Sequence, residues 1–361
     1  MKNKTNWIAS ALALVLLSSC EVDTAEKSYV VIPVVDAIGV ESKKLDDKDI
    51  TFVNPTIIPL ELTDKSMLGD VTIIGDEDGK LVVNDGQSVC LFNSSDGKYI
   101  SSISHKGRAA NEYLYCYQSV VDFKDSTIFI LDEGKILSYT FDGDHIKTVR
   151  NDSIASMSQL NDDVFVAYND AHSEHSYNYS LYDRDWNYIK GLYPFTKKEG
   201  VNPNVTSILT GRKFNDKLYT YIDNSFYEIT NNDFQQSIFI DKGEYAMPAE
   251  LLGSAKSSKY ITWDNNGMIV GDYLFYLYSY NDKLYLDIWG ISKGELLYRS
   301  TMSRLGDGEM GFPVKYNGTT VYMWPRYVQG NALYGVLSAD DVEKLGVDNN
   351  DNPVVLRVEI Q

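Results

Sequence analysis

The chain has 361 residues, of which 33 are basic and 51 acidic, giving a formal net charge of −18. This acidic excess argues against a nucleic acid or an anionic membrane surface as ligand, because both repel a negatively charged protein. Tyrosine is abundant, at 27 residues, and lies mostly in alternating runs, which favours strands over helices.

The N-terminus resembles an export signal with a lipid attachment site. A short basic start is followed by an apolar stretch over 7–17, which is too short to span a bilayer. The segment Leu17-Ser18-Ser19-Cys20 resembles the bacterial lipobox, in which the cysteine is acylated and becomes the first mature residue. We therefore predict a signal peptide over 1–19 and a lipid on Cys20. The alternative is an ordinary cleaved signal with a coincidental cysteine.

The mature chain is divided into a tether and one large domain. We predict that 20–50 contain the lipidated cysteine and its tether, which is polar and acidic to about residue 28, and that 51–361 form the domain. No later segment reaches about 18 consecutive apolar residues, so the lipid is the expected anchor. The expected location is the cell envelope, at the outer membrane, facing either the periplasm or the cell surface.

A repeated pattern fills the domain. Each copy has an alternating strand, a polar turn that often contains Asp-Gly, and a second alternating strand. The copies lie at 89–103, 136–149, 179–192, 226–240 and 284–299. A further strand precedes each hairpin, at 80–83, 127–131, 164–168, 217–222 and 273–278. Four strands in each unit, with turns recurring every 43 to 61 residues, are typical of propeller blades.

Five blades follow from this pattern, and a sixth is one strand short. Its three strands are expected at 319–323, 333–337 and 354–359. The run 56–62 could supply the missing strand and close the ring without a free edge. We therefore predict an all-β, six-bladed β-propeller with four-stranded antiparallel blades; a solenoid or a β-sandwich is the competing architecture. The segment 338–341 resembles a capping box before a short helix, and another short helix is expected at 248–255.

Two further cysteines, Cys90 and Cys116, lie in β-like apolar runs. An oxidising envelope would permit a disulfide between them. Two buried, unpaired thiols are the favoured interpretation, because a free cysteine behaves as a small hydrophobic residue.

This organisation resembles the six-bladed β-propeller lipoproteins of Bacteroidetes, which are NHL-like propellers. Members of that family typically carry a Gly-Arg-Gly-Pro-Gly-Glu-Tyr segment after the first hairpin. The corresponding stretch here reads Gly107-Arg108-Ala109-Ala110-Asn111-Glu112-Tyr113, which keeps the first glycine, the arginine, the glutamate and the tyrosine. The resemblance covers nearly the whole mature chain and implies a fold and an envelope location, but little about chemistry.

Few motifs point to catalysis. His172-Ser173-Glu174-His175 brings two imidazoles and a carboxylate together, but it lies in an Asn-, Asp- and Ser-rich turn and is interpreted as a solvated loop. The turn at 94–99 resembles the Asp-box of sialidase propellers, yet it lacks a residue between Asp and Gly, so an ordinary hairpin turn explains it. No nucleophile motif, phosphate loop or cysteine-rich metal spacing appears, and we predict no cofactor.

Aromatic and basic residues in the loops between blades are better candidates, because propellers usually bind ligands where these loops converge on the central channel. Trp and Tyr suit sugar faces or apolar peptide groups, and Arg suits carboxylates. The predicted ligand-binding residues are His105, Arg108, Glu112, Tyr113, Trp263, Trp324, Arg326 and Tyr327. The alternative is that the aromatic residues pack between blades and that Arg108 pairs with Glu112.

We predict a non-catalytic envelope lipoprotein that binds a glycan, a peptide or an outer-membrane protein partner. A metal-dependent hydrolase or lyase acting at the channel mouth is the alternative, and a purely structural partner of an outer-membrane complex is a third hypothesis. An enzyme would gather carboxylate, Asn or His side chains there. A binding protein would instead expose aromatic residues and arginines, and a scaffold a large apolar patch.

Overall fold

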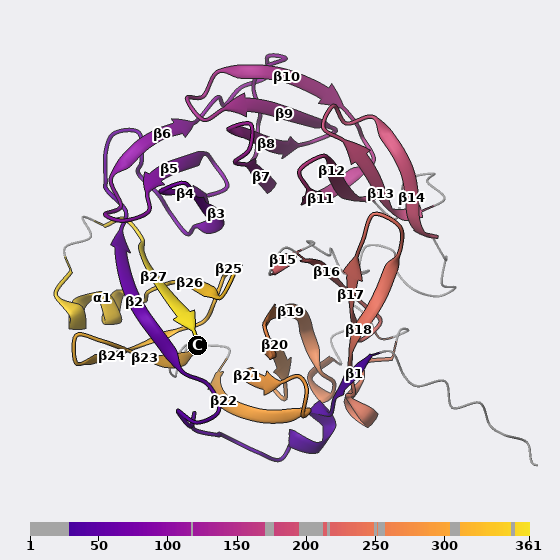
Figure 1. Ribbon diagram of the computed structural model, residues 1–361, viewed down its shortest axis with the longest axis vertical. Helices are drawn as coiled ribbons and strands as arrows, with labels where there is room; N and C mark the ends of the chain where they lie inside the picture. Colours follow the sequence, from indigo (N-terminus) through magenta and orange to yellow (C-terminus); the bar gives the residue numbers. More distant parts are fainter. Residues whose placement is uncertain are drawn as a thin grey trace, which may run out of the picture.

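The computed structural model describes residues 29–116, 118–169, 177–194, 212–214, 217–248, 251, 257–303, 311–347 and 351–361. In this part of the chain, six sheets stand around a common centre (Figure 1). The predicted six-bladed propeller is confirmed. The signal peptide, Cys20 and the segment His172-Ser173-Glu174-His175 lie outside the described residues.

Each of the first five blades is a four-stranded antiparallel meander whose strands follow chain order from the centre outward. Blade one contains β3 (Thr72–Glu77), β4 (Lys80–Asn84), β5 (Val89–Asn93) and β6 (Tyr99–Ile103). Blade two contains β7 (Gln118–Asp122), β8 (Thr127–Asp132), β9 (Lys135–Thr140) and β10 (His145–Arg150). Blade three contains β11 (Ile154–Asn161), β12 (Val164–Asn169), β13 (Tyr177–Asp183) and β14 (Tyr188–Pro194). These strands form the hairpins that we expected in blades one to three, so that prediction is confirmed. The polar turns determine where each strand ends.

Blades four and five repeat the same order. Blade four contains β15 (Arg212–Phe214), β16 (Lys217–Ile222), β17 (Ser225–Ile229) and β18 (Phe234–Ile240). Blade five contains β19 (Thr262–Val270), β20 (Tyr273–Tyr280), β21 (Lys283–Gly290) and β22 (Glu295–Ser303).

The sixth blade joins both ends of the chain. It contains β25 (Tyr327–Gln329), β26 (Ala332–Val336), β27 (Val354–Ile360) and, outermost, β2 (Phe52–Pro59). Because β2 pairs antiparallel with β27, the prediction that an N-terminal strand closes the ring is confirmed.

The prediction for one strand of the sixth blade was wrong. The segment Thr319–Met323 forms β24, which pairs with β23 (Phe312–Tyr316) in a separate two-stranded sheet. The turn between them is Asn317-Gly318, with φ values of 48° and 84°. An Asn-Gly turn with positive φ at both residues is the strongest short hairpin signal, so this segment pairs with its immediate neighbour rather than with the blade.

The N-terminal segment runs along the outside of blades four, five and six (Figure 1). β1 (Val30–Ile32) pairs parallel with β18, and η1 (Val34–Ala37) follows it. Farther along, Lys43 bridges to Arg299 of β22. We predicted a tether over 20–50, but the described residues from 29 onward belong to the propeller. The reason is apolar burial, since Ile32, Val34 and Ile50 are at most 2% exposed.

Helices are short in the described parts of the chain. α1 (Ala339–Leu345) begins where the capping box predicted it, and Ser338 Oγ accepts a hydrogen bond from the Asp341 amide at 3.2 Å. Among the residues described, no helix has the length and apolar character needed to span a membrane. The helix expected at 248–255 falls mainly outside the described residues.

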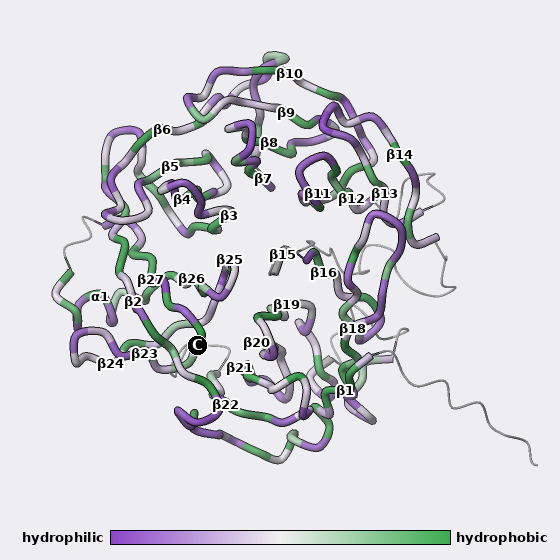
Figure 2. Tube along the Cα trace, viewed as in Figure 1, coloured by the Kyte–Doolittle hydropathy of each residue, from purple (hydrophilic) through white to green (hydrophobic). Residues whose placement is uncertain are grey.

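The core lies between adjacent blades, where apolar strand faces meet. Figure 2 shows hydrophobic residues along many strands, interspersed with hydrophilic ones in outer strands such as β10, and mainly hydrophilic residues in the turns. Cys90 packs between blades six and one, and Cys116 between blades one and two. Both are buried and unpaired, so the favoured interpretation of two free thiols is confirmed.

These thiols are expected to be unreactive in the folded protein. Burial raises the pKa of Cys90 to about 11 and that of Cys116 to about 12. Alkylation requires the thiolate, and at pH 8 a thiol of pKa 11 is ionised in about one molecule in a thousand. Mass spectrometry after iodoacetamide treatment at pH 8 should find neither residue modified in the native state and both modified in urea. Modification of either residue without denaturant would contradict the packing described here.

Candidate functional site

The predicted binding residues share one face of the ring. In a four-stranded meander, the turn between the two middle strands and the connection to the next blade emerge on the same side, because the strands alternate in direction. We call this side the connection face. His105 to Tyr113 lie between β6 and β7, Trp263 lies at the start of β19, and Trp324 precedes β25. The topology therefore gathers all three predicted groups on the connection face.

Most of the first group holds its own loop together. Tyr113 is fully buried, and its hydroxyl donates to the Ile103 carbonyl at 2.8 Å. His105 stacks on Tyr139, and its Nε2 lies 2.8 Å from the Gly143 carbonyl oxygen. Tyr113 therefore packs between blades, as in the alternative interpretation, whereas His105 is exposed and contacts blade two.

Glu112 and Arg108 do not pair with each other among the described contacts. Glu112 Oε2 accepts a hydrogen bond from the Ala109 amide at 2.9 Å, which closes the loop on itself. Arg108 is exposed and projects from the same loop.

Arg108 lines a cavity of about 270 Å³, which we call the Arg108 pocket. Three segments of the connection face supply its walls: the loop between β6 and β7, the turn between β8 and β9, and the connection from β10 to β11. The other lining residues are Gly107, Leu114, Asp132, Glu133, Gly134, Lys135, Arg150 and Asp152.

One ion pair fixes the shape of this pocket. The Asp132 side chain is 1% exposed, and its oxygens accept hydrogen bonds from the Leu114 amide at 3.0 Å and the Tyr115 amide at 3.2 Å. Lys135 Nζ lies 3.4 Å from Asp132 Oδ2. The carboxylate therefore ties the wall formed by the β6–β7 loop to the wall formed by the β8–β9 turn.

The remaining charged groups of the pocket are open to a ligand. Within the described chain, Arg108 and Arg150 make no ion pair or side-chain hydrogen bond, and neither do Glu133 and Asp152. Two guanidinium groups and two carboxylates thus line one cavity without neutralising each other through direct contact. Of these four residues, the sequence had predicted only Arg108.

The third predicted group joins blade six to its neighbours. Trp324 packs against Phe275 of blade five, with ring centroids 6.0 Å apart. Arg326 pairs with Asp70 in the connection between β2 and β3. The Tyr327 hydroxyl donates to Gln329 Oε1 at 2.9 Å within β25. All three residues therefore have contacts within the protein.

Trp263 differs from these residues because it is largely exposed, at 62%. It lies on blade five, across the ring from the Arg108 pocket on blade two (Figure 1). The structure therefore places the predicted residues at separate points of one face instead of gathering them in a single cleft. Over the described residues, no group of three His, Cys, Asp or Glu side chains is arranged to hold a metal ion.

Comparison with known proteins gives the family. A family model described as a domain of unknown function, DUF4934, matches residues 29–359. The chain belongs to the DUF4934 family. Because the DUF4934 match begins at residue 29, it includes the N-terminal segment along blades four to six. A search of curated proteins finds no match.

Solved structures share the fold of this DUF4934 chain. A Bacteroides fragilis protein described as exported superposes with a TM-score of 0.67 at 16% identity, covering 89% of this chain and 98% of that one. A member of the DUF4221 family from Bacteroides vulgatus superposes with a TM-score of 0.52 at 9% identity, covering 89% of this chain and 99% of that one. At these identities the likeness concerns the fold alone.

Proposed function

We propose that this DUF4934 propeller is an envelope-anchored, non-catalytic binding protein, and that the Arg108 pocket binds an anionic glycan. The observation that carries the proposal is the pair of guanidinium groups, Arg108 and Arg150, which line one cavity and have no partner within the described residues. Arginine binds carboxylates through two parallel hydrogen bonds, which gives both strength and orientation. Glu133 and Asp152 on the same walls can accept hydrogen bonds from sugar hydroxyls. A uronic acid offers both kinds of group.

The overall acidity of the chain does not oppose such a ligand strongly. At physiological ionic strength, exposed charges are screened beyond about 8 Å. Acidic residues elsewhere on the protein therefore contribute little at the pocket, whereas Arg108 and Arg150 would touch the bound carboxylate.

The path of the N-terminal segment supports an anchored orientation. β18 is the outer strand of blade four and runs toward the connection face, and β1 runs parallel to it. The N-terminal end of β1 therefore lies toward the opposite face. With a lipid on Cys20, the connection face would point away from the membrane, where a glycan can reach it. The description of the Bacteroides fragilis relative as exported also supports an envelope location.

Isothermal titration calorimetry of the purified protein tests this function. Tetragalacturonate is expected to bind, and Arg108→Ala and Arg150→Ala should each weaken binding about tenfold or more, because a hydrogen bond to a charged group contributes about 1.5–3 kcal/mol. Arg326→Ala, the same substitution at a paired arginine elsewhere on the face, should leave the affinity unchanged. Unchanged binding by both pocket variants would overturn the proposal. The proposal would also be overturned if a hexaglutamate peptide bound and tetragalacturonate did not.

A further inference from the structure

An ion pair with a buried lysine lies at the connection face between blades four and five. Lys242, in the connection after β18, has a side chain that is 3% exposed, and it pairs with Asp264 of β19. Lys242 Nζ also donates to Asn224 Oδ1 at 2.7 Å, in the turn between β16 and β17. A buried ammonium without its partner would cost several kcal/mol, so Lys242 is held against Asp264.

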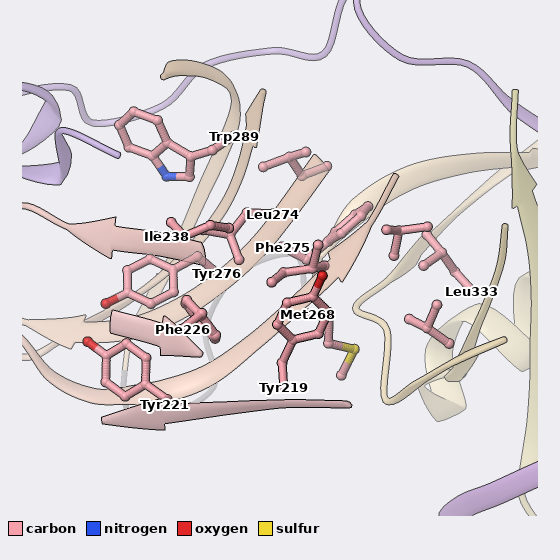
Figure 3. Packing of buried hydrophobic residues seen from close by; sticks show 14 of the residues in the cluster. Tyr219, Tyr221, Phe226, Ile238, Met268, Leu274, Phe275, Tyr276, Trp289 and Leu333 are labelled. Carbon is pink, nitrogen blue, oxygen red and sulfur yellow. The ribbon is translucent and has the colours of Figure 1, made fainter. Parts of the chain in front are cut away.

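Two tyrosines complete the surroundings of this carboxylate. The Tyr221 hydroxyl donates to Asp264 Oδ2 at 2.6 Å, and the Tyr276 hydroxyl donates to the same oxygen at 3.3 Å. Figure 3 shows the two rings with their hydroxyl groups pointing to the same side. Burial raises the pKa of both tyrosines well above its ordinary value, so both hydroxyls stay protonated and remain donors.

These donors leave one oxygen of the carboxylate for other use. Lys242, Tyr221 and Tyr276 all contact Oδ2, while Oδ1 receives no hydrogen bond from the residues that the structure describes. The Asp264 side chain is 17% exposed. Three donors thus hold one oxygen of the carboxylate, and the Asp264 side chain as a whole is partly open to solvent.

Trp263 lies next to this carboxylate in an unfavourable backbone conformation. Its φ is 58°, which costs roughly 1–2 kcal/mol for a residue with a Cβ. A register shift between Thr262 and Asn266 bends the strand at this point. Such bulges often re-aim side chains next to binding sites. Trp263, which is 62% exposed, is here adjacent in the chain to a partly exposed carboxylate.

We propose that Trp263 and Asp264 form a second binding site, which takes a neutral pyranose ring of a glycan. The indole would cover the apolar C–H face of the ring, and Asp264 Oδ1 would accept a hydrogen bond from a hydroxyl. A cationic ligand fits less well, because Lys242 already neutralises the carboxylate and is too buried to be displaced. A hydroxyl needs only an acceptor, and Oδ1 accepts no hydrogen bond from the described residues. This site is independent of the Arg108 pocket.

The test is a titration of the purified protein with neutral hexasaccharides: cellohexaose, maltohexaose, mannohexaose and chitohexaose. We expect at least one to bind, with Trp263→Ala weakening it at least tenfold and Trp263→Phe retaining most of the affinity, since an aromatic face remains. Trp263 is exposed, so its replacement should not unfold the protein. Tyr188→Ala, which removes a 58% exposed aromatic side chain from the outer strand β14, is the matched control and should bind normally.

Two further variants separate the alternatives. Asp264→Asn, checked first for an intact thermal transition, should weaken binding because it removes the charged acceptor. Arg108→Ala should leave binding of the neutral glycan unchanged. The proposal for Trp263 and Asp264 can therefore fail while the proposal for the Arg108 pocket stands, and the reverse. The proposal is overturned if no hexasaccharide binds at millimolar concentration or if Trp263→Ala binds as the unmodified protein does. A hexalysine peptide that binds through Trp263 while the saccharides do not would also overturn it.

Discussion

Replacing Arg299 with alanine is expected to lower the free energy of unfolding by about 3–5 kcal/mol, because the change leaves a buried carboxylate without its partner. Arg299 and Asp287 lie inside blade five, and both side chains are fully buried. The guanidinium Nε and Nη2 donate to the two oxygens of Asp287 at 2.7 and 2.6 Å. This bidentate geometry is the strong form of an ion pair.

The remaining donors of Arg299 hold the N-terminal segment. Nη2 also donates to the Tyr278 hydroxyl at 2.8 Å, and Nη1 donates to the Val40 carbonyl at 2.9 Å and to that of Ala37. All five N–H groups of the side chain are therefore satisfied. We expect Arg299→Ala to make the peptide bonds near Val40 susceptible to limited proteolysis under native conditions as well.

Urea denaturation measures the first effect, with Arg326→Ala as the control. Arg326 forms an ion pair with Asp70 at the surface, with side chains 36% and 79% exposed, and an exposed pair contributes at most about 1 kcal/mol. The double variant Arg299→Met, Asp287→Leu should be less destabilised than Arg299→Ala, because it leaves no unpaired charge. If Arg299→Ala and Arg326→Ala lowered the free energy of unfolding equally, burial would not have the role assigned to it here.

The repeating part of the fold could be predicted because its signals are local. An alternating run bounded by a polar turn specifies a hairpin by itself, and β5 and β6 have the predicted limits. β1 carries no comparable signal, since it has three residues and its position is set by a distant partner, β18. The pairing of β23 with β24 did carry a signal, the Asn317-Gly318 turn, which outweighs the blade pattern at that point.

The candidate sites were harder to predict, because their parts come from separate connections. Arg108 and Trp263 stand out in the sequence as a basic and an aromatic residue in loops. Arg150 lies at the end of one strand and Lys242 follows another. In the sequence, neither can be distinguished from a basic residue that is simply exposed to solvent. Only the folded ring brings Arg150 into the same cavity as Arg108 and Lys242 into contact with Asp264. A propeller face is built from connections of different blades, so its chemistry depends on distances between blades that no local pattern contains.

Gly97→Ala is expected to destabilise the protein by about 2–4 kcal/mol, through two separable effects. Gly97 lies in the turn between β5 and β6 with φ of 73°, where alanine costs roughly 1 kcal/mol or more. An added Cβ would also stand 1.9 Å from the carbonyl oxygen of Pro59, and such crowding typically costs a further 1–3 kcal/mol, roughly. The clash is with backbone, which cannot rotate away as a side chain could.

Gly79→Ala separates the two effects. Gly79 has φ of 74°, but an added Cβ there meets nothing within 4 Å, so only the conformational cost of about 1 kcal/mol applies. The difference between the two variants in urea denaturation therefore measures the contact with Pro59. That residue ends β2, the strand that closes the ring, and the Glu61 amide beyond it donates to the Gly97 carbonyl at 2.9 Å. Gly97→Ala should accordingly accelerate amide hydrogen exchange in β2 more than in β8. If Gly97→Ala and Gly79→Ala were equally stable in urea, the closing strand β2 would be able to shift without an energetic cost.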